Sequence, residues 1–147
     1  MKRHTGPVVL LLALGIVSLA APRSAPAAVP KPKKPRLDVR AVPRMALSPV
    51  TILFTAELVG GDDVEEYYCP ELEWDWDDGG KSVQEGDCPP YETGSKLVRR
   101  FTSEHEYRRA GAYNVKLTLL HSKKALTSAR VTVTVRPGFG DVSREES

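Results

Sequence analysis

The segment EWDWDDGG, residues 73–80, places four carboxylates, two tryptophans and two glycines in eight positions. Carboxylates at this density could bind a divalent cation or act as paired acid and base groups in a hydrolase. An EF-hand loop that began at Asp75 would put Gly79 and Gly86 where ligand oxygens are needed. Glycosidase chemistry needs two carboxyl groups that face each other across a cleft, and neighbours on one exposed strand face make no cleft. Both of these specific sites are therefore disfavoured.

A period of two along the same segment separates the acids from the aromatic side chains. Successive side chains of a β-strand point to opposite faces, so Trp74 and Trp76 would share a buried face and the intervening acids would face away from it. The acids and the tryptophans then do not belong to one site. A looser calcium site that uses Asp77 and Asp78 stays open as an alternative.

Asp78-Gly79 indicates a two-residue hairpin loop. A type I′ turn requires positive φ at both loop positions, which Asp tolerates and Gly adopts freely. With these two residues as the loop, opposed positions on the flanking strands sum to 157. Cys69 would then face Cys88.

The first 27 residues predict a secretory signal peptide. Lys2 and Arg3 precede an apolar run over residues 8–21, and a small-residue stretch over residues 24–28 contains an A-x-A cleavage site. The run has 14 residues, whereas a membrane span needs roughly 20, so we expect cleavage and no membrane span in the mature chain. This predicts a secreted protein or one of the periplasm or cell envelope.

The two cysteines of the chain, Cys69 and Cys88, predict one disulfide in an exported protein. The bond would close a loop of about 20 residues and contribute on the order of 3 kcal/mol.

Charge is segregated along the chain although the mature protein is nearly neutral. Without residues 1–27 the chain holds 18 Lys and Arg against 19 Asp and Glu, so net charge gives no support for nucleic-acid binding. Residues 62–87 hold eleven acids and one base, and residues 31–44 hold six bases and one acid. The acidic block could bind cations or a basic partner, or form a solvated polar face. A second basic cluster, which could contact an anionic glycan or stay solvated, comprises Arg99, Arg100, Arg108 and Arg109.

Alternation of apolar and polar residues predicts an all-β domain over residues 37–136. A linker rich in proline and lysine over residues 28–36 should precede it, and a flexible tail over residues 137–147 should follow. Six or seven short strands in about 100 residues indicate an antiparallel β-sandwich, which we expect to be monomeric. The clearest strands lie at 50–58, 113–119 and 129–136; weaker candidates lie at 37–42, with Pro43 favouring an edge position, and at 96–102.

Three motifs in order resemble the PKD (polycystic kidney disease) domain family. Trp74-Asp75-Trp76-Asp77-Asp78-Gly79 is similar to the signature W-D-F-G-D-G, and residues 49–56 are similar to P-x-x-V-x-F-T-A. A third motif is H-x-Y-x-x-x-G-x-Y-x-V-x-L-x-V. The residues of this chain that match its first five defined positions are His105, Tyr107, Gly111, Tyr113 and Val115.

The resemblance covers about residues 37–136 and implies an immunoglobulin-like β-sandwich of about seven strands. It also implies a non-enzymatic interaction or spacer module, whose partner would be an extracellular or envelope protein or polysaccharide. The chain departs from the family pattern in carrying Asp77 at the first glycine, a cysteine pair and an acidic insertion over residues 61–71. The final hairpin, residues 121–124, also lacks the customary glycine.

No convergent catalytic set is visible in the sequence, so we expect no enzyme activity. Histidines and cysteines lack metal-ligand spacing, and G-x-S-x-G is absent. His105 is expected to make a structural hydrogen bond. The first alternative function is a calcium-dependent accessory binding module, and the second, less favoured, is a small hydrolase. We expect no cofactor, with calcium as the alternative.

Three tyrosines flank the cysteines in expected loops. Exposed tyrosines are favourable contact residues, so Tyr67, Tyr68 and Tyr91 are candidate partner-binding residues. The alternative is that they cover the disulfide and the adjacent end of the sandwich.

Overall fold

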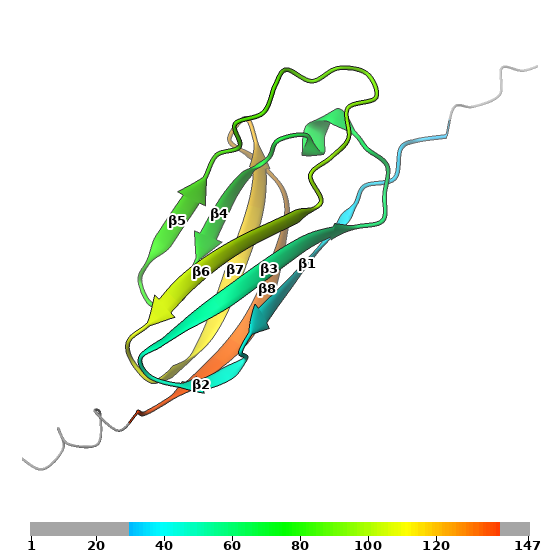
Figure 1. The fold of residues 1–147 in the computed structure, drawn as a ribbon. Helices are drawn as coiled ribbons and strands as arrows, with labels where there is room; N and C mark the ends of the chain where they lie inside the picture. Colours follow the sequence, from blue (N-terminus) through cyan, green and yellow to red (C-terminus); the bar gives the residue numbers. More distant parts are fainter. Residues whose placement is uncertain (1–29, 139–147) are drawn as a thin grey trace, which may run out of the picture. The chain divides into compact units, whose positions relative to one another are not determined.

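The computed structural model describes residues 30–138, in which eight strands form two sheets (Figure 1). The expected signal peptide and the greater part of the expected tail lie outside these residues. Within them the only helix is the short 3-10 helix η1, and no helix is long and apolar enough to cross a membrane. The strands are β1 (Arg36–Val42), β2 (Met45–Leu47), β3 (Val50–Val59), β4 (Glu71–Asp75), β5 (Lys81–Gln84), β6 (Arg100–Tyr107), β7 (Gly111–His121) and β8 (Lys124–Arg136), with η1 at Glu65–Tyr67.

The smaller sheet has the order β1-β3-β6 and the larger has the order β2-β8-β7-β4-β5. Every pair is antiparallel except β2 and β8, which are parallel over three residues. The all-β prediction is confirmed. The expectation of a wholly antiparallel arrangement of about seven strands missed β2, because a three-residue strand shows no alternation long enough to recognise.

The alternating apolar residues of both sheets meet in one core. The clear strand predictions at 50–58, 113–119 and 129–136 are confirmed within β3, β7 and β8. Each fully buried Val, Leu, Ile or Phe contributes about 1.5–3 kcal/mol relative to exposure. Fully buried core side chains include Ile52, Phe54, Trp74, Tyr107, Val115, Leu117, Leu119 and Val133.

Of the two weaker strand predictions, the one at 37–42 is confirmed and the one at 96–102 is shifted along the chain. β1 is an edge strand that ends before Pro43, as expected. β6 begins at Arg100, four residues later than the expected strand at 96–102, and continues to Tyr107. His105 and Tyr107 therefore lie within β6, and Tyr107 is its last residue.

The hairpin after β4 is one residue longer than expected, so the predicted register is wrong. Asp75 pairs with Lys81, which makes opposed positions sum to 156. Asp77 adopts a left-handed conformation with φ 63°, and Trp76 N donates to Gly80 O at 3.1 Å. The loop is consequently Asp77 to Gly79, because the left-handed region accepts an Asp here in place of the glycine of the motif.

The predicted disulfide between Cys69 and Cys88 is present, with 6.0 Å between the Cα atoms. It does not extend the strand ladder, because pairing of β4 with β5 ends at Leu72 and Gln84. Cys69 itself has φ 49°. The bond therefore joins two loops beyond the hairpin, and the predicted register, in which Cys69 faced Cys88 across a strand pair, gives no support to the pairing.

The residues just before β1 are bound to the loop after β3. Lys33 N donates to Asp62 Oδ2 at 2.7 Å, and Asp62 N donates to Lys33 O at 2.9 Å. Lys34 Nζ lies 3.0 Å from Glu66 Oε1. The expected linker is therefore docked over its last residues, and its final residue already belongs to β1.

The turn between β7 and β8 gives a first testable prediction. Ser122 and Lys123 have φ 49° and 67°, a region that costs a residue with a Cβ about 1–2 kcal/mol. Lys123→Gly should therefore raise the free energy of unfolding by about 1 kcal/mol. Chemical denaturation measures this change.

Lys123→Ala is the matched control, because it also removes the 3.9 Å ion pair with Glu71 but keeps the Cβ. The lysine end of that ion pair is exposed and the pair is long, so it contributes little. Equal stability of the Gly and Ala variants would contradict the account of strain in this turn.

Candidate functional site

Three rings form a parallel stack at the residues that the sequence singled out. Trp74 and Trp76 stack at 5.0 Å with an angle of 3°, and Trp76 stacks on His105 at 4.4 Å with an angle of 5°. Phe54 of β3 packs against both indoles at 5.8 and 5.2 Å. The predicted burial of both tryptophans is confirmed, since their exposed fractions are 0% and 3%.

Asp78 binds the polar edge of this stack. One carboxylate oxygen lies 2.7 Å from His105 Nε2, and the other accepts from Gly80 N at 2.8 Å. Burial raises the pKa of the Asp78 carboxyl, but the hydrogen bonds from His105 and Gly80 outweigh burial and lower the pKa below its usual value. An ionised carboxylate only accepts, so Nε2 of His105 carries the proton. The expected structural hydrogen bond of His105 is confirmed.

Asp77 connects the hairpin loop to β7. Its Oδ2 accepts from Asn114 N at 2.7 Å, and its own N donates to Asp75 Oδ1 at 3.3 Å. The alternation of residues 113–119 places Asn114 only among the polar residues of its strand, so the sequence pattern does not reveal this contact. Both acids of the loop thus satisfy backbone or ring N–H groups that strand pairing leaves free.

Two tyrosines of the third motif complete this end of the fold. Tyr107 Oη donates to Trp76 O at 3.0 Å, and Tyr113 Oη donates to Arg109 O at 2.8 Å. Their rings stack at 4.2 Å. Burial, followed by the charge of Asp78, raises the pKa of Tyr107 far above its usual value.

Gly111 and Val115 occupy positions that suit their sizes. A Cβ on Gly111 would lie 3.1 Å from the ring of Tyr113, so a larger residue would displace that ring. Val115 is fully buried in the core. Trp74, Trp76, Asp77, Asp78, His105, Tyr107, Gly111, Tyr113 and Val115 therefore have packing or hydrogen-bonding roles in the described structure.

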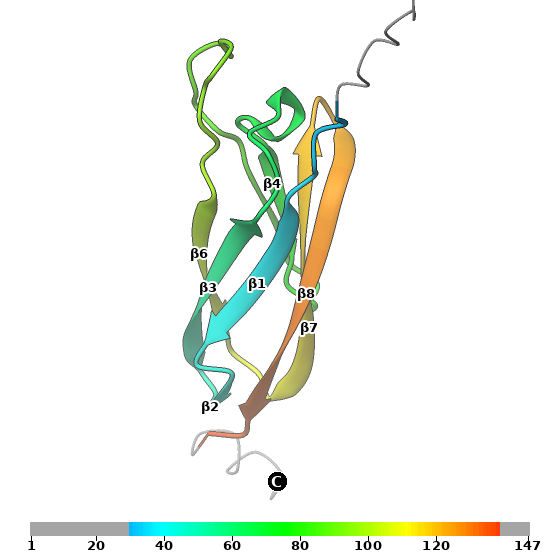
Figure 2. The same ribbon diagram turned by 90° about the vertical axis from the view of Figure 1, so that its right-hand side faces the viewer.

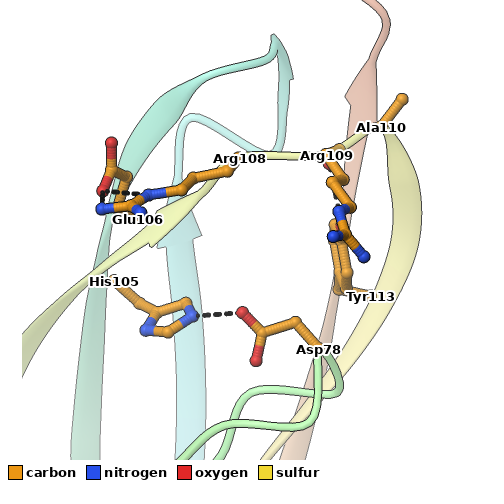
Figure 3. Close-up of a pocket in the computed structure, with 7 residues that line it drawn as sticks. All are labelled: Asp78, His105, Glu106, Arg108, Arg109, Ala110 and Tyr113. Atoms are coloured by element: carbon orange, nitrogen blue, oxygen red, sulfur yellow. Dashed lines mark hydrogen bonds and ion pairs between the residues drawn. The ribbon is translucent and has the colours of Figure 1, made fainter.

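A pocket of about 700 Å³ lies beside this network, with His105 and Asp78 on its wall (Figure 3). Glu106 accepts from Arg108 within the same lining, at 3.0 Å. A histidine held by a carboxylate could activate a serine, threonine or cysteine for covalent catalysis, which requires such a side chain within hydrogen-bond reach of the imidazole. The lining contains no Ser, Thr or Cys; it consists of Asp78, His105, Glu106, Arg108, Arg109, Ala110 and Tyr113.

Most of the acidic block already has partners in the structure. Within residues 30–138, no group of three or more His, Cys, Asp or Glu side chains is placed to hold a metal ion. The two possible metal ligands, Asp77 and Asp78, accept the hydrogen bonds given above. Seven of the eleven acids of residues 62–87 bind a side chain or a backbone N–H: Asp62, Asp63, Glu66, Glu71, Asp75, Asp77 and Asp78.

The three candidate tyrosines differ in accessibility. Tyr67 is only 2% exposed, so its expected role in partner binding is wrong; it belongs to the core. Tyr68 and Tyr91 are half-buried and meet edge to face at 5.3 Å. Tyr68 Oη also donates to Pro89 O at 3.1 Å, which links the two loops that the disulfide joins.

The four arginines of the expected second cluster are divided between the two ends of β6. Arg99 binds the loop after β3, donating to Gly60 O at 2.6 Å and to Asp63 Oδ1 at 2.7 Å. Arg108 and Arg109 follow the strand at its other end. Arg99 thus has a structural role that its sequence neighbours did not indicate, and the four residues do not form one surface.

No known protein-family model matches the chain, and no curated protein matches it significantly.

Acid titration tests the role of Asp78. Its lowered pKa means that the ionised carboxylate stabilises the fold above about pH 4, and that this stabilisation is lost as pH falls through the folded-state pKa. Asp78→Asn should lower the free energy of unfolding by about 1–2 kcal/mol at pH 7, and by less at pH 3. Urea denaturation at a series of pH values measures the difference.

Asp87→Asn is the control, since it makes the same charge change at an exposed acid with no hydrogen bond or ion pair within residues 30–138. Its effect should stay within about 0.5 kcal/mol at every pH. A constant deficit of Asp78→Asn from pH 7 to pH 3 would count against the charged hydrogen bond.

Gly86 gives a prediction about the disulfide. A Cβ at this position would overlap Cys69 Sγ and lie 3.3 Å from Cys88 Sγ. Gly86→Ala should therefore destabilise the oxidised protein by about 1–3 kcal/mol, because the bonded sulfurs cannot both move away. In a background with both cysteines changed to Ala, the same substitution should be nearly neutral. A double-mutant cycle by thermal denaturation measures this, and equal costs in the two backgrounds would contradict it.

Proposed function

We propose that the chain is an exported, non-enzymatic PKD-like domain with an immunoglobulin-like fold, which acts as a binding or spacer module outside the cell or at its envelope. One observation carries the proposal: residues of the PKD-like motifs converge in space and satisfy one another. Asp78, His105, Trp76 and Tyr107 are separated by up to 31 positions, yet they form one continuous network.

The absence of a reactive arrangement at this network also supports a binding or spacer role. The carboxylates that looked catalytic accept hydrogen bonds from the hairpin loop, from β7 and from His105. The disulfide fits an oxidising compartment, where such bonds persist.

Export and processing provide the first test. Mass spectrometry of the chain recovered from its native host should find it outside the cytoplasm, with a new N-terminus near Ala28 and without free thiols. An unprocessed cytoplasmic chain with reduced cysteines would overturn the proposal.

Partner capture and turnover provide the second test. The tagged protein should enrich a defined protein or polysaccharide from envelope or extracellular fractions, and a Trp74→Ala variant that has lost its fold should not. Hydrolysis of a glycan, peptide or ester that disappeared in folded Asp78→Asn would show an enzyme and contradict the proposal.

A further inference from the structure

A groove of about 540 Å³ lies between β1 and β8, which run side by side in Figure 2. The buried apolar floor of the groove comes from Val39, Ala41 and Val131, whose exposed fractions are 7%, 3% and 7%. The remaining lining residues are polar or charged except for one, the exposed Val42. They are Asp38, Arg40, Val42, Arg44, Arg130 and Thr132.

Two open strand edges border this groove. β1 is the edge of the smaller sheet and, among residues 30–138, pairs only with β3. β8 pairs with β7 on one side, and on its other side with β2 over residues 134–136 alone. Within the described part of the chain, β8 therefore offers backbone N–H and C=O groups without a strand partner over residues 124–133. Such an edge can pair with an added strand.

The charge of the groove is positive and largely uncompensated. The charged residues of the lining are three arginines, Arg40, Arg44 and Arg130, and one acid, Asp38. That carboxylate, on Asp38, lies 3.8 Å from Arg40 Nη2, and both side chains are largely exposed, so the pair is weak. Arg44 and Arg130 make no ion pair with a carboxylate of residues 30–138.

We propose that this groove binds an acidic polypeptide segment in extended conformation, which adds as a strand to the open edge of β8. Carboxylates of the segment pair with Arg40, Arg44 and Arg130, and apolar residues between them contact the floor of Val39, Ala41 and Val131. The proposal rests on the proposed binding function and specifies the chemistry of the partner.

The open edge of β8 and the arginines of the groove both favour a peptide over an acidic polysaccharide. The open edge of β8 presents alternating donors and acceptors, which the backbone of an extended peptide matches along its whole length. Side chains of such a peptide point alternately to two faces, so acids and apolar residues separate at a period of two. Guanidinium groups can bind carboxylates through two parallel hydrogen bonds, which adds geometric specificity to the charge.

The same arginines could serve only to prevent the edge from pairing with a second copy of the chain, since charged side chains commonly protect edge strands. The two roles predict different behaviour. A binding role requires affinity for acidic peptides over basic ones, whereas protection requires only that removal of the charge causes self-association.

Fluorescence anisotropy of labelled twelve-residue peptides tests the proposal with the purified full-length protein. A peptide of alternating Glu and Val should bind, and one of alternating Lys and Val should not. Arg130→Gln and Arg44→Gln should each weaken binding by about 5- to 10-fold. Arg100→Gln is the control, because Arg100 is also an exposed arginine but pairs with Glu57 away from the groove; its effect should stay within about 2-fold.

A backbone-methylated form of the Glu-Val peptide separates strand addition from charge alone. It keeps every side chain but loses N–H donors, so its affinity should fall by more than about 10-fold. Equal binding of the methylated peptide, or equally tight binding of an oligogalacturonate, would overturn the proposal. Self-association of Arg130→Gln without any peptide binding by the unchanged protein would overturn it as well.

The experiments distinguish failure of the acidic-peptide inference from failure of the proposed function. Suppose that the unchanged protein does not bind the Glu-Val peptide but still enriches an envelope partner, and that Arg130→Gln enriches the same partner equally. The inference about the groove is then wrong, whereas the proposed binding function is retained. If the chain is found unprocessed in the cytoplasm, the proposed function fails whatever the peptide result.

Discussion

The contact between His105 and Asp78 is the interaction on which this end of the fold depends. The imidazole comes from the smaller sheet, and the indole stacked on it follows a strand of the larger sheet, so the stack joins the two sheets. An imidazole placed against apolar rings needs a partner for its N–H, because a buried polar group without a hydrogen bond costs about 1–3 kcal/mol. Asp78 supplies that partner, and its carboxylate must therefore be held at the rim of the stack.

The need to hold the Asp78 carboxylate beside His105 accounts for the conformation of the hairpin loop, Asp77 to Gly79. Asp78 also accepts from Gly80 N, and Asp77 accepts from Asn114 N, so two carboxylates fix a three-residue loop to itself and to β7. The left-handed conformation of Asp77 is the strained element that these contacts stabilise. Residues whose types suggest catalysis thus hold the backbone of the loop, since both loop carboxylates accept hydrogen bonds from within the protein.

The long strands and the burial of the tryptophans could be predicted from local sequence, whereas the hairpin register and the role of Arg99 could not. A period of two identified the long strands, and the parity of Trp74 and Trp76 gave their burial, because both follow from backbone geometry alone. The register failed by one residue, since whether Asp77 enters the left-handed region depends on its bond to Asn114, 37 positions away. The role of Arg99 was missed for the same reason: its acceptors lie on a loop about 40 positions earlier.

The segregation of charge along the sequence becomes a functional asymmetry only in three dimensions. Acids of residues 62–87 are mostly bound to the protein itself, so the block that looked available for a partner is largely occupied. Bases of residues 31–44 are less compensated, with ion pairs at Lys34 and weakly at Arg40. Arg130, which is remote in sequence, joins Arg40 and Arg44 at the groove. Part of the uncompensated positive charge of residues 30–138 therefore lies beside the open edge of β8, where side-chain charge and backbone groups are close enough to act on one ligand.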